Sequence, residues 1–381
     1  MTNSIHKRRW DIFCRVIDNY GDIGVCWRLA RQLSNEYSFD VHLWVDEIQA
    51  LVTIWPSAKL IDHQLIDGVT VERWDDQSAS YRPANVVIEA FACNLPESYV
   101  VAMKQLPTPP RWFNLEYLSA ELWVEECHGL NSMHPQHGLK NTFYFPGFTS
   151  KTGGLLKEKK LFVERDEFQR NKQLQDAFMQ RLGVAPQPDA ILVSLFGYEN
   201  SAISSLLDSF SANETPIVCL VPAGRILPDI NLHFKKTLTI GDVFTEKSLT
   251  LKIIPFLIQT DYDRLLWLCD INFVRGEDSF VRAQWAAKPF IWHIYPQDDD
   301  VHMAKLEALL NIYLKDANSD FKEALGKLWH KWNRGENCSE SWEQCLENYQ
   351  SWLNHSQTWP IYLESLGDLA QNIVHDSQKV M

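Results

Sequence analysis

Two aspartates, Asp18 and Asp22, lie four residues apart in the stretch DNYGDIG, directly after the apolar run WDIFCRVI (10–17). Glycines beside them are typical of a turn between a strand and a helix. Paired carboxylates at such a turn can attract a cationic group and accept a proton from it. Asp22 could instead cap a helix beginning at Ile23, an alternative that the local sequence leaves open. Asp18 is harder to explain as a cap.

A second polar stretch, RGEDS (275–279), follows the apolar run INFV and precedes an apolar-faced helix predicted through Phe280, Ala283, Trp285 and Ala287. Unpaired N–H groups at a helix start, together with the fork of donors on Arg275, could bind a diphosphate. Glu277 could then accept hydrogen bonds from sugar hydroxyls. The alternative is a capping pair, Asp278 and Ser279, beside a surface ion pair.

A third stretch, SLFGYEN (194–200), ends another apolar run with a glycine and Tyr198, whose hydroxyl could donate to a phosphate. The same pattern is common as a plain strand-to-helix turn. The sequence contains no GxGxxG, GxxxxGK[ST] or HExxH motif. The acidic run 298–300 is interpreted as a solvated loop or a helix start, and DYD (261–263) as the start of a helix. No metal and no cofactor are therefore expected.

These stretches need strands and helices to position them. Apolar runs alternate with helix-period stretches along nearly the whole chain, a pattern typical of parallel sheets covered by helices. In the first half, the predicted strands are 10–17, 41–45, 69–74, 85–91 and 111–117. In the second half they are 191–197, 216–224, 249–257, 271–276 and 289–295. In such sheets ligands bind beyond the carboxyl ends of the strands, where all three polar stretches lie.

The chain has 381 residues, enough for two domains with separate cores. The pattern of strands restarts after APQPDA (185–190). We therefore predict an α/β protein with two Rossmann-like domains facing across a cleft, as in GT-B glycosyltransferases: 1–184, which would bind the acceptor, and 185–361, which would bind a nucleotide sugar. The last helix, about 362–381, is a candidate to pack back on the first domain.

Composition narrows the classes of partner. The formal charge of −13 disfavours binding to nucleic acid, which needs a basic face, and suits a cationic partner better. The eight cysteines form no CxxC pair and most lie in apolar runs, as reduced packing residues do. No stretch approaches the ~18 apolar residues of a membrane span, and no signal core follows the basic N-terminus. A cytoplasmic protein without a membrane partner is expected.

Several motifs together resemble the EarP family, the protein-arginine rhamnosyltransferases of elongation factor P. They are WDIFCRVIDNYGDIGVCWRLARQL, NLEYLSAE, FPGF followed by KTGGL, LFGYEN and RGEDSFVRAQWAAKPFIWHIYPQ. The resemblance implies a two-domain inverting enzyme that moves rhamnose from dTDP-β-L-rhamnose to an arginine of elongation factor P. It also implies that this transfer needs no metal ion.

The resemblance also assigns residues. It implies that Asp18 and Asp22 bind the acceptor, that Asp22 is the base, and that Glu277 is a third important carboxylate. The implied donor-binding residues are Tyr198, Phe256, Gln259, Arg275, Glu277, Asp278, Ser279 and Tyr295. Two alternatives stay open: a nucleotide-sugar epimerase on the same fold, and a non-catalytic binder of a basic protein segment.

Overall fold

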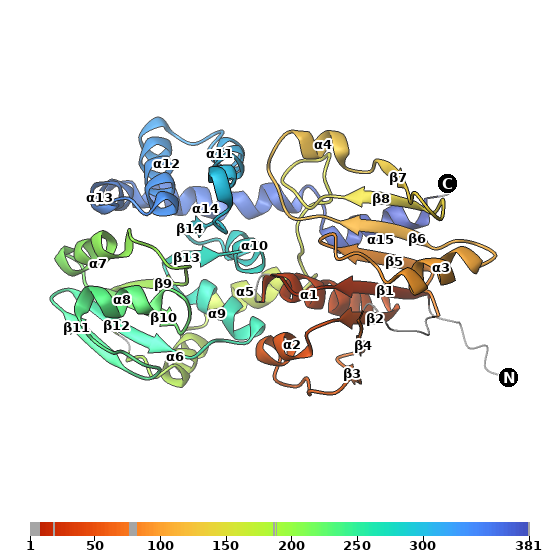
Figure 1. Ribbon diagram of the computed structural model, residues 1–381. Helices are drawn as coiled ribbons and strands as arrows, with labels where there is room; N and C mark the ends of the chain where they lie inside the picture. The colour runs from red at the N-terminus through yellow and green to blue at the C-terminus, as the bar shows by residue number, and fades with distance from the viewer. Residues whose placement is uncertain (1–7, 18–19, 76–81, 186, 188, 380–381) are drawn as a thin grey trace. The chain divides into compact units, whose positions relative to one another are not determined.

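The computed structural model describes residues 8–17, 20–75, 82–185, 187 and 189–379, except for the side chain of residue 298 (Figure 1). The chain divides into two compact units. The first comprises Met1–Lys159 and Leu363–Met381, and the second comprises Lys160–Tyr362. Each unit is built around its own sheet.

The sheet of the first unit has eight strands among the described residues, in the order β3-β4-β2-β1-β5-β6-β8-β7. They are β1 (Arg9–Cys14), β2 (Asp40–Val45), β3 (His63–Ile66), β4 (Val69–Arg73), β5 (Val86–Ala90), β6 (Arg111–Leu115), β7 (Asn131–Met133) and β8 (Lys140–Tyr144). The six inner strands are parallel, and β3 and β7 pair antiparallel at the two edges. The sheet is therefore mixed but dominated by parallel pairs.

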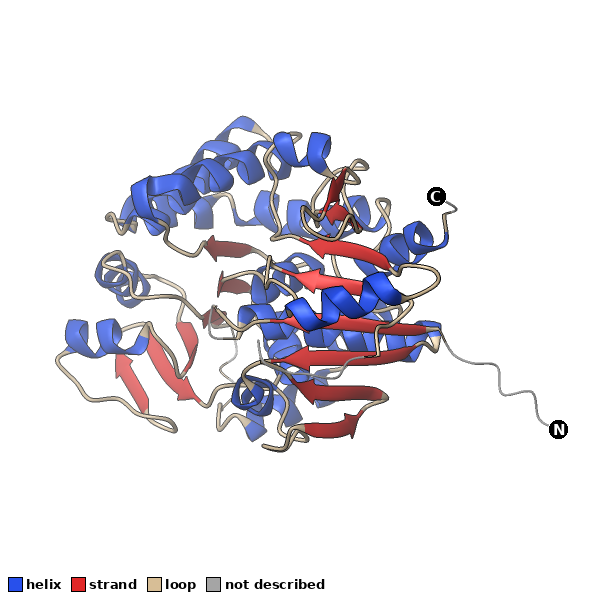
Figure 2. Cartoon of the chain, turned by 45° about the vertical axis from the view of Figure 1, so that its right-hand side comes forward, coloured by secondary structure: helices blue, strands red, loops and turns tan. Residues whose placement is uncertain are grey.

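Helices cover both faces of this sheet (Figure 2). They are α1 (Gly21–Tyr37), α2 (Ile48–Ile54), α3 (Glu97–Gln105), α4 (Trp123–Cys127) and α15 (Leu369–Gln378). Side chains alternate along β1, so that Phe13 packs with Tyr99 and Met103 of α3 on one face. On α1, the predicted helical spacing is confirmed, because the five residues that carry it are fully buried: Ile23, Cys26, Trp27, Ala30 and Leu33.

The sheet of the second unit has six strands among the residues described, in the order β11-β12-β10-β9-β13-β14. They are β9 (Ile191–Leu195), β10 (Ile217–Pro222), β11 (Val243–Glu246), β12 (Leu249–Ile254), β13 (Ile271–Arg275) and β14 (Phe290–His293). All pairs are parallel except β11 with β12. The sheet is again dominated by parallel strands.

Many helices surround this second sheet. They are α5 (Leu161–Arg170), α6 (Lys172–Arg181), α7 (Ile203–Ala212), α8 (Leu227–Phe234), α9 (Gln259–Leu268), α10 (Asp278–Trp285), the short 3-10 turn Asp298–Asp300, α11 (Val301–Tyr313), α12 (Ser319–Arg334), α13 (Ser339–Glu347) and α14 (Tyr349–Glu364). Tryptophans of the C-terminal helices fill the core: Trp332 and Trp342 are fully buried and pack on Phe273 of β13.

Both sheets have a topological switch point. In the first unit the strand order reverses between β1 and β5, and in the second between β9 and β13. Loops that leave two neighbouring strands toward opposite faces form a crevice there, where ligands of doubly wound proteins bind. The stretch after β1 contains Asp22, and the stretches after β9 and β13 contain Tyr198 and Arg275.

The ten predicted strands are all present, although most end one to three residues earlier than predicted. Phe280, Ala283 and Trp285 lie on α10 as predicted, but Ala287 lies beyond its end with a positive φ of 57°. The division between the units also differs from the predicted one. It falls after Lys159 and not after 184, because helices α5 and α6 cluster with the second unit.

The side chains of α5 explain that difference. Gln169 donates to the backbone carbonyls of Trp267 and Ala286, and Arg165 donates to the carbonyl of Trp285. At the other end of the chain, α15 joins the first unit, where the N–H of Leu369 donates to the carbonyl of Leu155 at 3.0 Å. The predicted boundary had followed the restart of the strand pattern after 185–190.

A buried ion pair joins α9 to α10 beneath the second switch point. Arg282 donates through Nε and Nη2 to the two carboxylate oxygens of Asp263, at 3.0 and 2.8 Å, and both side chains are almost fully buried. DYD (261–263) was interpreted only as the start of a helix. Asp263 has a second role, because it forms this buried ion pair.

Replacing Arg282 by methionine is expected to lower the free energy of unfolding by about 3 to 5 kcal/mol, because it leaves the Asp263 carboxylate buried without its counter-ion. Urea unfolding measures this change. Arg264→Met is the matched control, because it removes only a solvent-exposed ion pair with Asp261 and should cost under about 1 kcal/mol. Equal effects of the two substitutions would contradict the assignment.

Candidate functional site

Arg275 ends β13 at the switch point of the second unit, and two aromatic rings hold its guanidinium. Its Cζ lies 4.4 Å from the ring centroid of Phe196 and 4.8 Å from that of Tyr198, both in the segment after β9. Stacking on aromatic faces stabilises a guanidinium and restricts its orientation. The cation is thus fixed where β9 and β13 end side by side.

The turn from Arg275 to Ser279 is held by its own hydrogen bonds. Ser279 Oγ donates to the carbonyl of Arg275 and accepts from the Arg275 N–H at 3.2 Å. Gly276 has a φ of +62°, which glycine adopts without steric cost, and its carbonyl accepts from Trp292 Nε1 at 2.9 Å. α10 begins directly after this turn.

The capping alternative is therefore wrong for RGEDS. Glu277 occupies the N-cap position of α10 and forms no side-chain cap hydrogen bond. Asp278 accepts instead from Gln259 Nε2 at 3.2 Å, and Ser279 bonds to Arg275. Glu277 is half-buried and directly precedes the start of α10.

Tyr198 lies at the centre of an aromatic group that comes from three segments. Its ring lies edge-on to His293 at 5.3 Å and to Tyr295 at 5.4 Å, and the guanidinium of Arg225 lies 5.5 Å from its centroid. The Tyr198 ring is buried, whereas Tyr295 is half exposed. The structure thus brings Tyr198, Tyr295 and Arg275 together.

Phe256 and Gln259 complete this group from the segment between β12 and α9. Phe256 is half-buried and packs edge-on against Phe196 at 6.3 Å. Gln259 is buried and reaches Asp278. All eight residues expected to bind the donor therefore lie around the carboxyl ends of β9, β12, β13 and β14. Sequence reasoning missed Phe196 and His293, whose contacts depend on the packing of separate segments.

His293 is a buried neutral histidine in this group. Its Nδ1 accepts the Tyr198 N–H at 3.3 Å, which assigns the ring proton to Nε2. Burial, together with the positive charge of Arg275, lowers its pKa from 6.5 to about 3. The unfolded chain therefore binds this proton at a higher pH than the folded chain does.

Stability should consequently fall as the pH falls from 7 to 5, and His293 alone should account for about 2 kcal/mol of that loss. The unfolded histidine titrates near 6.5 within this window, whereas the folded one stays neutral until about pH 3. Comparing urea unfolding of the wild type and His293→Asn at both pH values measures the contribution. The variant should lose about 2 kcal/mol less, and an unchanged pH dependence would refute the assignment.

In the first unit, Asp22 lies in the first turn of α1 and is almost fully buried. Its Oδ2 accepts the N–H of Ile17 at 2.9 Å, so the carboxylate points back toward the end of β1. The N-cap residue of α1 is Tyr20, which shows that Asp22 is not the helix cap. Asp18 lies outside the described residues.

Two glutamates that sequence reasoning missed, Glu89 and Glu116, also lie at the carboxyl ends of strands of this sheet. Glu89 is buried at the end of β5, beside β1, where it accepts from Asn94 N–H at 2.9 Å and from Trp112 Nε1 at 3.1 Å. Burial raises the pKa of Glu89 and of the half-buried Glu116, which follows β6. A charged residue within the apolar run NVVIEAF was the available signal for Glu89.

The loop after β5 is strained. Phe91, Ala92 and Asn94 have φ values of 54°, 50° and 57°, a region that costs non-glycine residues free energy. Phe91 stacks on Tyr117, with ring centroids 4.6 Å apart. Backbone strain of this kind is concentrated at functional sites. It therefore agrees with a site at the carboxyl ends of β1 and β5.

Known proteins resemble the chain over almost its whole length. A family model described as elongation factor P (EF-P) rhamnosyltransferase EarP matches residues 10–377. A protein-arginine rhamnosyltransferase of Pseudomonas putida is 50% identical over 338 residues, which cover 88% of this chain and 89% of that protein. The chain belongs to the EarP family. It is a protein-arginine rhamnosyltransferase of the EarP type.

Solved structures agree with this assignment. A structure described as the structural basis for EarP-mediated arginine glycosylation of translation elongation factor EF-P matches with a TM-score of 0.72 and 36% identity, covering 98% of this chain and all of that one. A UDP-GlcNAc 2-epimerase from Neisseria meningitidis matches with a TM-score of 0.51 at 10% identity, over 97% of this chain and 98% of that one. The second likeness shows the fold alone, and the predicted GT-B fold is confirmed.

Within the part of the chain that the structure describes, no group of three or more histidine, cysteine, aspartate or glutamate side chains could hold a metal ion. Among the same residues, no helix is both long and apolar enough to cross a membrane.

Proposed function

We propose that this EarP-family enzyme moves L-rhamnose from dTDP-β-L-rhamnose to a guanidinium nitrogen of an arginine in elongation factor P, with inversion at the anomeric carbon. The observation that carries the proposal is the fixed cation at the second switch point: Arg275 stacked on Phe196 and Tyr198, directly before the start of α10. This arrangement suits a sugar nucleotide diphosphate. Membership of the family supports the choice of donor and acceptor.

On the donor side, each residue has a chemical task in this proposal. Arg275 and the first N–H groups of α10 bind the diphosphate, and the hydroxyls of Tyr198 and Tyr295 donate to it. Phe256 and Gln259 bind the thymine, which needs one apolar face and one amide. Asp278 and Ser279 contact the ribose and the diphosphate. Glu277 accepts hydrogen bonds from the rhamnose hydroxyls.

On the acceptor side, Asp22 and Asp18 hold the guanidinium. A guanidinium has a pKa of about 12 or higher, whereas an ordinary aspartate has a pKa near 4. An aspartate therefore cannot remove the guanidinium proton before the new bond begins to form. The nitrogen becomes acidic only as its bond to the anomeric carbon forms. Asp22 then accepts the proton late in the step, as a general base.

The proposed transfer is a single displacement. The guanidinium nitrogen attacks the anomeric carbon from the face opposite the diphosphate, the bond from that carbon to the diphosphate oxygen breaks, and the electron pair leaves with dTDP. One displacement inverts the carbon without a covalent sugar on the enzyme. The charge that develops on the diphosphate is stabilised by Arg275, the tyrosine hydroxyls and the helix N–H groups. We propose that this set suffices without a metal ion.

The two alternatives make different predictions. An epimerase on the same fold would change the sugar nucleotide without any protein acceptor. A non-catalytic binder of a basic segment would need the acidic edge of the first unit but not Arg275 and its aromatic partners. The proposed transferase needs both the acidic residues of the first unit and Arg275 with its aromatic partners in the second unit.

Intact-mass measurement tests the proposal. Elongation factor P incubated with this protein and dTDP-L-rhamnose should gain one deoxyhexose, and the gain should be unchanged by EDTA. NMR spectra of the donor without acceptor should show no change in its sugar. An unmodified elongation factor P beside a converted sugar would favour the epimerase, and loss of transfer in EDTA would overturn metal independence.

A further inference from the structure

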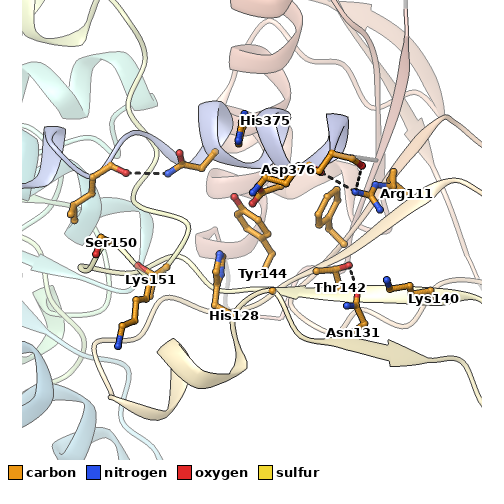
Figure 3. Close-up of a pocket in the computed structure, with 16 residues that line it drawn as sticks. Arg111, His128, Asn131, Lys140, Thr142, Tyr144, Ser150, Lys151, His375 and Asp376 are labelled. Atoms are coloured by element: carbon orange, nitrogen blue, oxygen red, sulfur yellow. Dashed lines mark hydrogen bonds and ion pairs between the residues drawn. The ribbon is translucent and has the colours of Figure 1, made fainter. Parts of the chain in front are cut away.

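A pocket of about 550 Å³ lies within the first unit, away from the residues assigned to rhamnose transfer (Figure 3). β6, β8 and α15 form its walls, together with the loops around 128–131 and 150–152. Its lining residues are Arg111, Phe113, His128, Gly129, Asn131, Lys140, Thr142, Tyr144, Ser150, Lys151, Thr152, Leu366, Asn372, His375, Asp376 and Lys379. Pockets of this size bind small molecules.

Simple periodicity explains why polar side chains meet here. Lys140, Thr142 and Tyr144 alternate along β8 and so share one face of the sheet. From α15, Asn372, His375, Asp376 and Lys379 follow the spacing of one helix face, so that a stripe of α15 lies opposite the strands. Figure 3 shows Arg111 from the sheet meeting Asp376 from the helix.

The pocket is basic, although the whole chain has a formal charge of −13. Four cationic side chains line it, namely Arg111, Lys140, Lys151 and Lys379, against the single carboxylate Asp376. Lys379 pairs with Asp376, and Lys151 pairs with Glu125. Arg111 donates through Nη2 to the backbone carbonyls of Asp376 and Lys379, at 3.1 and 2.8 Å. These acceptors are neutral, and no described residue is found in an ion pair with Arg111.

A neighbouring guanidinium adds to the positive potential. Burial, and then the charge of Arg111, lower the pKa of Arg8. Arg8 donates to the hydroxyl and the carbonyl of Ser377, near the end of α15. Two guanidinium groups therefore lie close together, and an anion between β6 and α15 would reduce their repulsion.

Two buried donors in the pocket, Arg111 Nε and the hydroxyl of Tyr144, form no hydrogen bond of normal geometry with the described residues. After burial, the charge of Asp376 and a side-chain hydrogen bond of poor geometry to it raise the pKa of Tyr144. Arg111 Nε has no such neighbour among the described residues. An unsatisfied buried donor is costly, which is the usual sign that a ligand or ordered water belongs there.

His128 supplies one more donor. Its Nδ1 accepts the N–H of Phe145 at 3.0 Å, so the neutral ring carries its proton on Nε2. Burial lowers the pKa of His128, and Lys379 adds to this shift while Asp376 opposes it. The ring packs edge-on against Tyr144, with centroids 4.6 Å apart. His128 and Tyr144 together present donors from the same end of the pocket.

We propose that this pocket is a binding site for a small organic phosphate with at least two negative charges. Phosphate oxygens accept from guanidinium, ammonium, imidazole and hydroxyl donors at once, and those are the groups that the walls offer. A neutral ligand would leave the cations unbalanced, and a cation would be repelled. Because the walls come from β6, β8 and α15, a bound anion would link the C-terminal helix to the sheet and stabilise the first unit.

Histidine NMR provides a local test. Inorganic pyrophosphate and glucose 1-phosphate are titrated into the full chain, with glucose as the uncharged control, and the ring resonances of His128 and His375 are assigned with His128→Gln and His375→Gln. Both resonances should shift with a single saturable curve and a Kd below about 1 mM. Glucose should produce no shift. Binding at the donor site of the second unit would instead shift the His293 resonance, so the two sites can be distinguished.

Three variants make the test specific. Tyr144→Phe removes one hydroxyl, and Lys140→Met removes an exposed cation that forms no ion pair with a described residue; each should weaken binding about tenfold. Lys104→Met is the matched control, because it removes one exposed cation from α3, on the other face of the same sheet. Absence of a saturable His128 shift up to about 10 mM, or equal effects of the three variants, would overturn the proposal.

Discussion

Replacing Asp22 by asparagine is expected to lower the rate of transfer about 10³-fold and to leave the affinity for dTDP-L-rhamnose nearly unchanged. Asparagine can still accept the N–H of Ile17, so the end of β1 keeps its hydrogen bond. What is lost is the negative charge and the proton acceptor. Single-turnover kinetics with elongation factor P and calorimetric titration of the donor measure the two effects separately.

Asp46→Asn is the matched control for this substitution. Asp46 also accepts a backbone N–H at the end of β1, from Val16 at 2.9 Å, but we assign it no role in the reaction. It should therefore change the transfer rate by less than about fivefold, the size of an ordinary surface effect. Equal losses in the two variants would mean that loop geometry, and not the Asp22 proton acceptor, limits the rate.

Replacing Arg275 by methionine is expected to raise the Kd for the donor about 100-fold. A guanidinium that makes charge-assisted hydrogen bonds to a diphosphate contributes about 3 kcal/mol in a partly buried site, which corresponds to that factor. Methionine keeps an apolar contact with Phe196, so the fold should persist. Arg275→Lys keeps the charge but loses the planar fork, and an intermediate loss of affinity is expected.

The control for Arg275 is Arg264→Met, which removes an exposed guanidinium from the same unit. Calorimetric titration with dTDP should show nearly wild-type affinity for that variant. If Arg275→Met also bound dTDP normally, the diphosphate would have to bind elsewhere, and the assignment of the donor site would be wrong.

Much of this arrangement is predictable from local sequence. Apolar runs locate ten of the strands, all but β8 among the inner ones and the edge strand β14 besides. Polar stretches directly after three of them identify the turns that reach the two switch points. The rule for doubly wound sheets then explains why Tyr198 and Arg275, 77 positions apart in the chain, become neighbours. That step needs only the order of the strands.

Other features depend on packing that a local pattern does not contain. β3, β7 and β11 are short antiparallel edge strands with exposed positions, so they lack the apolar runs that identify the inner strands. The buried carboxylate of Glu89 accepts from Trp112, on the neighbouring strand β6, and from the N–H of Asn94 in the loop after β5. The basic pocket similarly requires α15 to return to β6 and β8 from the end of the chain.

The division between the compact units likewise depends on packing. The strand pattern restarts only after 185–190, but Gln169 and Arg165 of α5 bind carbonyls of α9, of the last residue of α10 and of the residue after it, so α5 clusters with the second unit. Long polar side chains can dock a helix through its partner's backbone, and hydrophobic periodicity does not report this.

The stereochemistry of the product tests the central claim most directly. Elongation factor P modified by this protein with dTDP-β-L-rhamnose is digested, and the purified glycopeptide is analysed by fragmentation mass spectrometry and NMR. The account predicts an α-linked rhamnose on a guanidinium nitrogen of one arginine. A β-linked rhamnose, or a sugar on any other type of side chain, would contradict a single displacement by a guanidinium held at the Asp22 edge.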